Sequence, residues 1–408
     1  VYRVTGSSKF GANNRYGNFW SAGLGWNIHN ESFVTSSKID ILKIRGSLGY
    51  TGKVNFSPFQ AMTMYQFSGD LEYLNGIGAV PQGIGNEDLG WERELSYNLG
   101  TDISLFDRRL NFTFDIYLKK TTDLVLDASR APSTGTTSAK ENIGEMENKG
   151  LEFQVDGMLV QRNDFYWQVA ATGSMNRNRI LKINSALKKA NEDANKVGSK
   201  TPLAQYEEGE STTALKVVKS AGIDPATGQE VFIKLNGERT FEYSADDKFV
   251  IGDTEPRFRG TVSTNLFYKG FSLYLLGRYE CGAYLYNETR ATKVEGANPK
   301  KNADKRVFDS RWKNPGDIAF YKDIADSDGW GTNPKHSDRF VEKENVFTLG
   351  TVNFGYEFGQ NICSKIGVRN LRVGVNLTDI VRWSNVKIER GTTYLYSNGF
   401  EFTLSTTF

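Results

Sequence analysis

Hydrophobic and polar residues alternate with a period of two along much of the chain. In the clearest stretch, 109–121, every second residue from Leu110 to Leu118 is apolar and the residues between them are polar. This period places the apolar residues on one face of a strand and the polar residues on the other. The same pattern predicts twelve strands, at 1–6, 16–28, 39–52, 94–106, 109–121, 148–160, 165–177, 257–267, 271–281, 346–358, 370–378 and 398–408.

The segments that link these strands are long and short in turn. Three tight turns, at 107–108, 161–164 and 268–270, are flanked by aromatic residues. Outer-membrane barrels have short periplasmic turns, long extracellular loops and aromatic girdles at the membrane interfaces. We therefore expect an all-β transmembrane antiparallel β-barrel. Its extracellular loops would be the long segments at about 53–93, 122–147, 178–256, 282–345 and 379–397.

A soluble all-β fold is the alternative, because alternating strands also build sandwiches and barrels in water. The last strand favours the membrane, since its alternation continues to the terminal Phe408, where a soluble sheet would fray into polar coil. Backbone amides in hydrocarbon must all be paired, so membrane strands have to close into a ring. We expect Phe408 to face lipid at the periplasmic rim and to act as the barrel assembly signal.

Composition adds few constraints. The net charge of the 408-residue chain is only +2, which gives no reason to expect a nucleic-acid partner. No apolar run approaches the roughly 20 residues of a membrane-spanning helix, but a barrel strand needs only about 9 to 11. The chain begins at Val1, with neither a starting Met nor a signal peptide. We therefore expect it to be the C-terminal piece of a longer protein.

Seven blocks of sequence together point to a known family. They are GSSKFGANNRYGNFWSAGLGWNI (6–28), IDILKIRGSLGYTGK (39–53), NEDLGWERELSYNLGTDISLFDRRLNFTFDIYLKKTTDLVL (86–126), NIGEMENKGLEF (142–153), AGIDPATGQ (221–229), IGDTEPRF (251–258) and LRVGVNLTDI (371–380). In these blocks the chain resembles the SusC-like (RagA-like) TonB-dependent transporters of Bacteroidota. The resemblance covers essentially all 408 residues.

The resemblance implies a barrel of twenty-two strands with an N-terminal plug, located in the bacterial outer membrane. It also implies energy from the TonB-ExbB-ExbD system, which would act through the N-terminal region, and a SusD-like surface lipoprotein as a partner. Twelve strands here would leave ten for the rest of the barrel. A barrel of that size has a lumen wide enough to need a plug.

Charged residues on the polar faces of the strands are candidates for the lumen wall. They are Glu94, Asp102, Asp115, Arg257, Arg259, Arg278 and Arg372. They would line the lumen or meet the plug. The alternative is a solvated wall without a specific role, because a polar lumen is general in such barrels.

Aromatic residues in the long loops are candidates for contact with a substrate or partner. They are Trp312, Tyr321, Trp330, Trp383, Tyr394 and Tyr396. Aromatic faces can stack on sugar rings or hold peptide side chains. The same residues can equally pack beneath a partner lipoprotein or form a small core inside the loop, and the sequence leaves these alternatives open.

The sequence gives little support for enzyme chemistry. Its two histidines, His29 and His336, fall in a predicted periplasmic turn and a predicted extracellular loop, so they cannot meet in one site. Motifs of serine hydrolases, zinc proteases and phosphate-binding loops are absent. GIGAVPQGIG (76–85) is rich in glycine but lacks the setting of a dinucleotide site, and we interpret it as a loop. No cofactor is expected.

Two other groups of residues could carry chemistry. Asp323, Asp326 and Asp328 could face a cation, but their spacing departs from the EF-hand loop and lacks its closing Glu, which favours an ordinary acidic turn. Cys281 and Cys363 are expected near opposite membrane surfaces, about 30 Å apart, which is too far for a disulfide.

We therefore expect energy-dependent import of a large nutrient, an oligosaccharide or a peptide. A passive porin or an adhesin barrel is the first alternative, and an outer-membrane barrel enzyme is the second.

Overall fold

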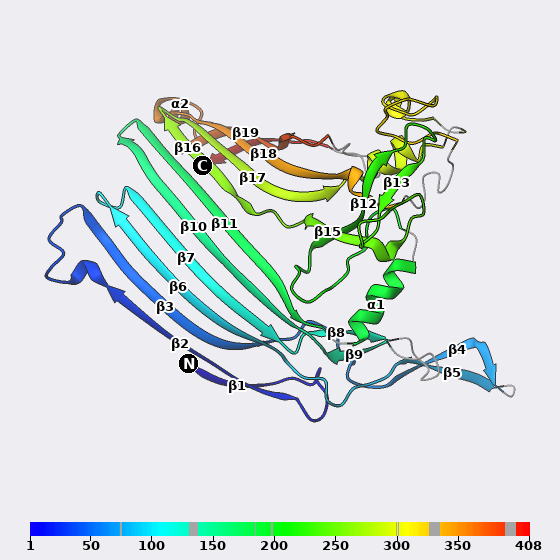
Figure 1. Cartoon of the computed structure of the whole chain (residues 1–408). Coiled ribbons are helices and arrows are strands. Elements are labelled where there is room, and N and C mark those ends of the chain that lie inside the picture. Colours follow the sequence, from blue (N-terminus) through cyan, green and yellow to red (C-terminus); the bar gives the residue numbers. More distant parts are fainter. Residues whose placement is uncertain are drawn as a thin grey trace.

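The main body of the molecule is one antiparallel sheet of twelve strands that neighbour one another in chain order (Figure 1). The computed structural model describes residues 1–73, 76–129, 138–183, 185–196, 199–298, 300, 302–325, 335–387 and 397–408. The twelve strands are β1 (Tyr2–Gly6), β2 (Tyr16–Asn27), β3 (Ile39–Lys53), β6 (Glu92–Leu105), β7 (Leu110–Thr122), β10 (Glu145–Arg162), β11 (Phe165–Lys182), β16 (Phe258–Tyr268), β17 (Phe271–Tyr286), β18 (Val341–Glu357), β19 (Asn370–Ser384) and β20 (Gly399–Thr407). Each corresponds to one predicted strand, so the predicted set is confirmed.

One face of this sheet is apolar along its whole width. Directly opposed residues of antiparallel strands point to the same side. Leu99 faces Ile116, and Ile116 faces Leu151, so three neighbouring strands present aliphatic side chains to one face. These side chains are exposed, with 86% of Leu24 and 63% of Phe402 accessible. A broad exposed face of this kind fits contact with hydrocarbon rather than water.

Tight hairpins lie at one end of the sheet, and the long connections lie at the other end (Figure 1). Lys269 and Gly270 join β16 to β17 with positive φ angles of 46° and 90°, as expected for a two-residue hairpin turn. Tyr268 lies 6.0 Å from Phe165, between ring centroids, in the neighbouring hairpin. The predicted tight turns and their aromatic flanks are therefore confirmed. The connection from β18 to β19 at this end contains a short helix, α2 (Gln360–Lys365), which the sequence did not predict.

Several strands extend beyond their predicted ends on the side of the long loops. β11, β17 and β19 continue to Lys182, Tyr286 and Ser384, and β18 begins at Val341. The extensions of β11 and β18 carry polar residues on both faces, and that of β17 has apolar residues at consecutive positions from Ala283 to Tyr286, so the alternation that predicts a strand is lost. The loops are consequently shorter than predicted.

The long connections contain secondary structure of their own. They include hairpin β4 (Met64–Tyr73)–β5 (Gly76–Gly83), hairpin β8 (Val125–Ser129)–β9 (Ser138–Asn142) and helix α1 (Ser185–Lys196). They also include a small sheet in the order β14 (Arg239–Thr240), β13 (Glu230–Ile233), β12 (Ala214–Ile223), β15 (Lys248–Asp253). Our interpretation of 76–85 as a loop was wrong, because residues 76–83 pair with β4 in spite of their glycines.

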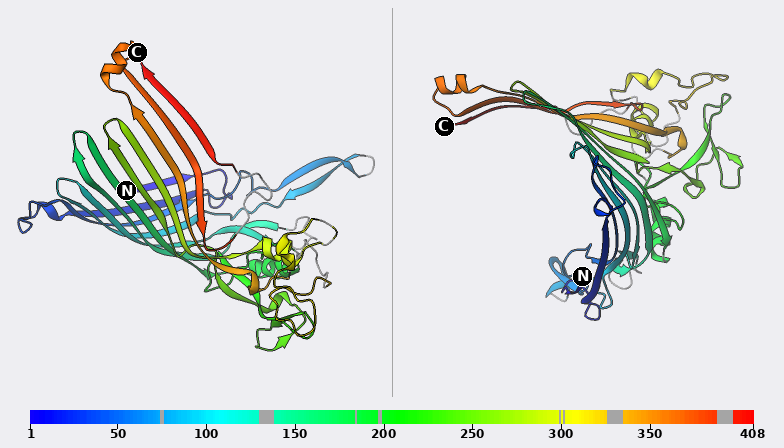
Figure 2. Two further views of the ribbon diagram at one scale, coloured as in Figure 1. Left: turned by 90° about the horizontal axis from the view of Figure 1, so that it is seen from above. Right: turned by 90° about the vertical axis from the view of Figure 1, so that its left-hand side faces the viewer.

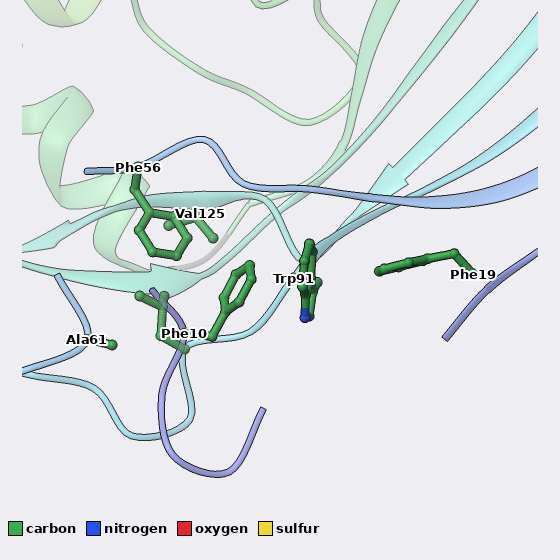
Figure 3. Packing of buried hydrophobic residues seen from close by; sticks show 7 residues of the cluster. Phe10, Phe19, Phe56, Ala61, Trp91 and Val125 are labelled. Atoms are coloured by element: carbon green, nitrogen blue, oxygen red, sulfur yellow. The ribbon is translucent and has the colours of Figure 1, made fainter. Parts of the chain in front are cut away.

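Buried side chains gather beneath the connections rather than within the large sheet. The cluster in Figure 3 joins the β1–β2 connection to the segments before β4 and β6. The ring of Phe10 lies 4.2 Å from that of Trp91 and 5.3 Å from that of Phe56, between centroids. This cluster fixes how the first long connection leaves the sheet.

The large sheet is curved (Figure 2) and does not close on itself. Within the described residues, β1 and β20 each pair with a neighbour on one side only. The fold is thus an arc of antiparallel strands with two free edges, and the total of twenty-two strands stays a prediction. Among the helices in the described part of the chain, none is long and apolar enough to cross a membrane.

Candidate functional site

The polar face of the sheet carries a three-residue charge cluster at its centre. Arg45 on β3 donates from Nε to Asp102 on β6, with 3.2 Å to Oδ2, and from Nη2 to Asp115 on β7 at 2.5 Å. Gly100 gives room for this arrangement, because a Cβ there would lie 2.4 Å from Asp115 Oδ1. The cluster pins a guanidinium across three strands and leaves its carboxylates on the polar side.

The other predicted lumen residues are distributed singly along the same face. Glu94 accepts a hydrogen bond from Lys53 at 2.5 Å. Arg259 and Arg278 lie 3.8 Å from Glu255 and 3.5 Å from Asp379. Arg372 donates to Ser272 Oγ at 3.3 Å, and Arg257, just before β16, lies beside Gly282. Asp102 and Asp115 are brought together by Arg45, and Asp115 also lines one cleft with Arg259; a role of these residues in a lumen stays a prediction.

Two long connections meet to form one folded unit outside the sheet, which we call the loop body. It consists of the described residues of 199–257, between β11 and β16, and of 287–340, between β17 and β18. Val218 on β12 pairs with Ser337 in a parallel bridge, and its amide donates to the His336 carbonyl at 3.0 Å. Trp312 donates from Nε1 to the Pro225 carbonyl at 2.8 Å. The loop body is therefore a composite of segments far apart in the sequence (Figure 1).

A buried guanidinium holds this body together. Arg339 on η6 (Asp338–Phe340) contacts Glu230 on β13 at 2.6 Å and Glu295 on η4 (Arg290–Glu295) at 2.8 Å. It also donates to the Phe320 carbonyl at 2.6 Å. Burial alone would lower the pKa of Arg339, but the two carboxylates outweigh burial and raise it. The Arg339 side chain thus connects η6, β13 and η4, which come from both connections, and its charge is fully paired.

A second buried guanidinium satisfies backbone carbonyls instead of carboxylates. Arg311 donates to the carbonyls of Val307, Lys322 and Val294, at 2.6, 2.9 and 2.6 Å. Burial lowers the pKa of Arg311. Val294 and Val307 lie near the ends of the short helices η4 and η5 (Lys305–Phe308), where carbonyls lack partners within the helix, and Arg311 supplies the missing hydrogen bonds.

The predicted loop aromatics do not form one exposed surface. Trp312 and Tyr321 are only 9% and 6% exposed and pack inside the loop body. Trp383 lies within β19 rather than in a loop, and it faces Phe347 on the apolar face at 5.7 Å between ring centroids. The remaining three predicted aromatics lie outside the described residues; they are Trp330, Tyr394 and Tyr396. A role in substrate or partner contact stays a prediction for all six.

Sequence reasoning missed an exposed apolar strip on the β4–β5 hairpin, which projects from the loop side of the sheet (Figure 1). Tyr65, Phe67 and Ile77 are 61%, 74% and 73% exposed. The alternation of Tyr65 and Phe67 with polar residues could have signalled a strand here. Such a strip on a projecting hairpin is a candidate contact surface.

Residues that could carry other chemistry are dispersed. His29 lies in η1 (Ile28–Asn30) at the tight-turn end, whereas His336 lies in the loop body. Cys281 and Cys363 are free, as predicted. Asp323 accepts a hydrogen bond from the Ala325 amide at 3.1 Å, and the two other predicted acidic residues, Asp326 and Asp328, lie outside the described residues. Within the described part of the chain, no group of acidic, histidine or cysteine residues could hold a metal.

Comparison with known proteins identifies this architecture. Residues 2–217 match the family model described as TonB dependent receptor-like, beta-barrel. TonB-dependent receptor P39 of Formosa agariphila is 27% identical over 94% of this chain and 40% of its own length. TonB-dependent receptor SusC of Bacteroides thetaiotaomicron is 26% identical over 72% of this chain and 30% of its own. The chain thus spans about 40% of the length of the first of these relatives.

Solved structures show the same fold. The RagAB peptide transporter matches with a TM-score of 0.79 at 23% identity, over 93% of this chain and 41% of the matched chain. The RagAB peptide importer in its open-open state matches with a TM-score of 0.80 at 22% identity, over 98% of this chain and 44% of the matched chain. The resemblance seen in the sequence is confirmed, and so are the barrel fold and a location in the outer membrane. The chain belongs to the family of TonB-dependent receptor β-barrels, with SusC among its relatives.

Proposed function

We propose that this chain is the barrel portion of an energy-dependent importer of a large nutrient across the outer membrane. The observation that carries the proposal is the separation of the two faces of the sheet, with one continuously apolar and the other bearing charge clusters such as Arg45–Asp102–Asp115. A wall with hydrocarbon on one side and charge on the other fits a wide, water-filled lumen. The family is one of transporters rather than enzymes.

The substrate class we propose is an oligosaccharide or a peptide. Support comes from the names of similar proteins, since one solved neighbour is a peptide transporter and one relative is SusC. The loop body adds physical support, because its Arg339 and Arg311 networks make it a rigid scaffold on which exposed loop residues keep fixed positions. Substrates too large for ordinary porins need such an extended, preformed surface.

Two partners complete the proposal. A SusD-like surface lipoprotein would cover the loop side, and the exposed strip of Tyr65, Phe67 and Ile77 is a surface it could cover. TonB-ExbB-ExbD would supply energy through the N-terminal part of a longer protein. Of the predicted loop aromatics, Trp312 and Tyr321 would support these surfaces from inside the loop body.

The test is uptake by cells that carry the full-length protein as their only importer of this family. Fluorescent peptides and oligosaccharides are supplied with and without a protonophore. Import that stops with the protonophore supports the proposal, whereas import that continues supports a passive porin. Hydrolysis of the substrate at the cell surface, lost in a His336→Gln variant, would support the enzyme alternative.

The polar face is tested with paired variants in the same cells. Arg257→Gln/Arg259→Gln removes two predicted lumen charges, and we expect slower uptake of charged peptides at unchanged barrel abundance. Lys234→Gln in the loop body is a control, since its ion pair with Glu238 is solvent-exposed. Unchanged uptake by the double variant would show that these arginines belong to a solvated wall and have no specific role in transport.

A further inference from the structure

The outward, apolar face of three neighbouring strands turns basic over two successive levels, the first with Lys149 and Arg177 and the second with Lys120 and Arg179 on either side of Glu147. On β7 the apolar residues end at Leu118, and the next residue on that face is Lys120. On β10 and β11, Lys149 and Arg177 follow the last apolar residues of the same face. Arg179 lies one step further along β11. We call these four residues, Lys120, Lys149, Arg177 and Arg179, the basic row.

The first of these levels coincides with the edge of the hydrocarbon layer. From the tight-turn end, β7 runs nine residues from Leu110 to Leu118, and β11 runs eleven from Phe165 to Met175. A tilted barrel strand crosses the hydrocarbon with about 9 to 11 residues. The basic row therefore begins where the strands leave the acyl chains on the loop side.

The basic row is not neutralised by its protein neighbours. Lys149 and Arg177 stand directly opposite each other across β10 and β11, an arrangement of like charges that destabilises a sheet. Lys149 reaches Glu147 only at 4.0 Å, and Lys120 lies 3.4 Å from Glu145. Among the described residues, the side chains of Arg177 and Arg179 make no hydrogen bond or ion pair, although Glu147 stands opposite Arg179 and Lys120 in the ladder. Two carboxylates thus face four cations.

An apolar groove lies beside the basic row on the same face and meets it at β7. It has a volume of about 550 Å³ and extends from β2 to β7. Leu24, Leu48 and Leu118 are among the apolar side chains that line it, and the missing side chain of Gly46 on the same face hollows it. Leu118 at its outer edge is followed on that face by Lys120. A groove for an acyl chain and a group of cations for a headgroup therefore adjoin.

We propose that this surface binds one phosphate-bearing glycolipid of the outer leaflet, with an acyl chain in the groove and the phosphate on Lys120, Lys149 and Arg177. Arginine and lysine form strong charge-assisted hydrogen bonds with phosphate. A bound phosphate would also relieve the repulsion between Lys149 and Arg177. Basic residues just outside a bilayer attract anionic headgroups in general, and the opposed pair makes this a localised site.

The test uses the full-length protein in phosphatidylcholine nanodiscs doped with phosphorylated lipid A, and counts retained lipid A by native mass spectrometry. The wild-type protein is expected to retain it, and Lys149→Gln/Arg177→Gln to bind about thirtyfold more weakly, since each basic residue contributes about 1 kcal/mol. Lys120→Gln is expected to bind about fivefold more weakly. If the double variant does not assemble into the membrane, the Lys120→Gln variant tests the proposed lipid A site.

Lys119→Gln is the matched control, because Lys119 precedes Lys120 on β7 and points to the polar face. It should retain lipid A as the wild type does. Equal retention by all variants, or equal loss with Lys119→Gln, overturns the proposal. Full displacement of lipid A by millimolar inorganic phosphate would show a site for the free anion and would overturn the lipid assignment.

Discussion

At the scale of single residues, the buried guanidinium of Arg339 in the loop body is paired with two buried carboxylates. Arg339 is 7% exposed and meets two carboxylates that are 5% and 8% exposed. Taking one partner away from such a group leaves the others buried without compensation, which costs far more than the loss of a surface ion pair. The stability of the loop body should accordingly depend strongly on Arg339.

Arg339→Met is expected to destabilise the loop body by about 3–5 kcal/mol, because Glu230 and Glu295 stay behind without their cation. Hydrogen exchange measured by mass spectrometry should show faster exchange in β12 and β13, with β10 and β11 unchanged. The control Lys234→Gln removes an exposed ion pair with Glu238 and should change exchange by no more than about 1 kcal/mol. Equal protection of β13 in both variants would contradict this account.

A second residue makes the loop body sensitive to acid. Burial lowers the pKa of His336 from 6.5 to about 4, so His336 is neutral in the folded loop body over a range where the unfolded segment binds a proton. Below about pH 6.5 the unfolded form therefore gains protons that the folded form does not. Stability from this residue is complete above about pH 6.5 and is lost as the pH falls toward 4.

We expect exchange in the loop body to accelerate between pH 6.5 and 4.5 after correction for the intrinsic rate. In His336→Gln this acceleration should be smaller. Asp338 acts in the opposite direction, since burial raises its pKa and protonation favours its folded form. The difference between wild type and variant isolates His336, and an identical pH profile for the two proteins would refute its role.

At the scale of strands, aromatic side chains of the large sheet pack over glycines of the neighbouring strand. Gly173 and Gly260 are opposed on β11 and β16, and each is covered by the aromatic residue of the next strand outward. Phe153 lies over Gly173, and Tyr279 lies over Gly260 and donates from its hydroxyl to the Thr172 carbonyl at 2.7 Å. A side chain at either glycine would displace its aromatic cover.

Gly260→Ala is expected to destabilise the full-length barrel by at least about 1–3 kcal/mol, because its Cβ would lie 1.9 Å from the Thr172 carbonyl oxygen and 2.5 Å from the Tyr279 hydroxyl. The measurement is the temperature at which the barrel loses its compact mobility in gel electrophoresis. Gly46→Ala is the control, since the nearest atom to its Cβ is 4.0 Å away. Identical temperatures for the two variants would argue against this packing role.

The same scale shows what could be predicted from sequence. All twelve strands were predictable because a lipid-facing side imposes a strict period of two, as on β7 from Leu110 to Leu118. The small sheet of the loop body was missed because β14 has two residues and β13 four, too few for a period, while the ten-residue β12 is buried at four consecutive positions, Leu215 to Val218, and so does not alternate. For Trp312 the sequence left open a contact surface or a core inside the loop, because nothing in its local sequence reveals that Gly228 and Pro225 enclose it.

The charge sites divide in the same way. The placement of Asp102 and Asp115 on the polar face follows from parity alone, but their shared partner Arg45 depends on the register of three strands. The Arg339 network joins residues separated by up to 109 positions, from Glu230 to Arg339, and no local pattern encodes it. Ion pairs between residues so far apart in the sequence cannot be inferred from one sequence.

At the scale of the whole molecule, the free edges of β1 and β20 decide how this chain behaves alone. Unpaired strand edges cannot face hydrocarbon, because their amides and carbonyls would find no partner there. We expect the 408-residue chain, refolded in detergent, to associate through these edges. Light scattering coupled to size-exclusion chromatography should show oligomers of the 408-residue chain. A monodisperse, detergent-bound monomer of the 408-residue chain would contradict the open arc.

The composite build of the loop body has a consequence for engineering. Because Arg339 comes from one connection and its partner Glu230 from another, each connection needs a matching residue in the other. A chimera that takes only residues 287–340 from a homologue would separate Arg339 from its native partner Glu230. A chimera that takes 199–257 and 287–340 together keeps the matched residues of one protein. Recombination between relatives, in the laboratory or in evolution, should therefore exchange these two stretches as a unit.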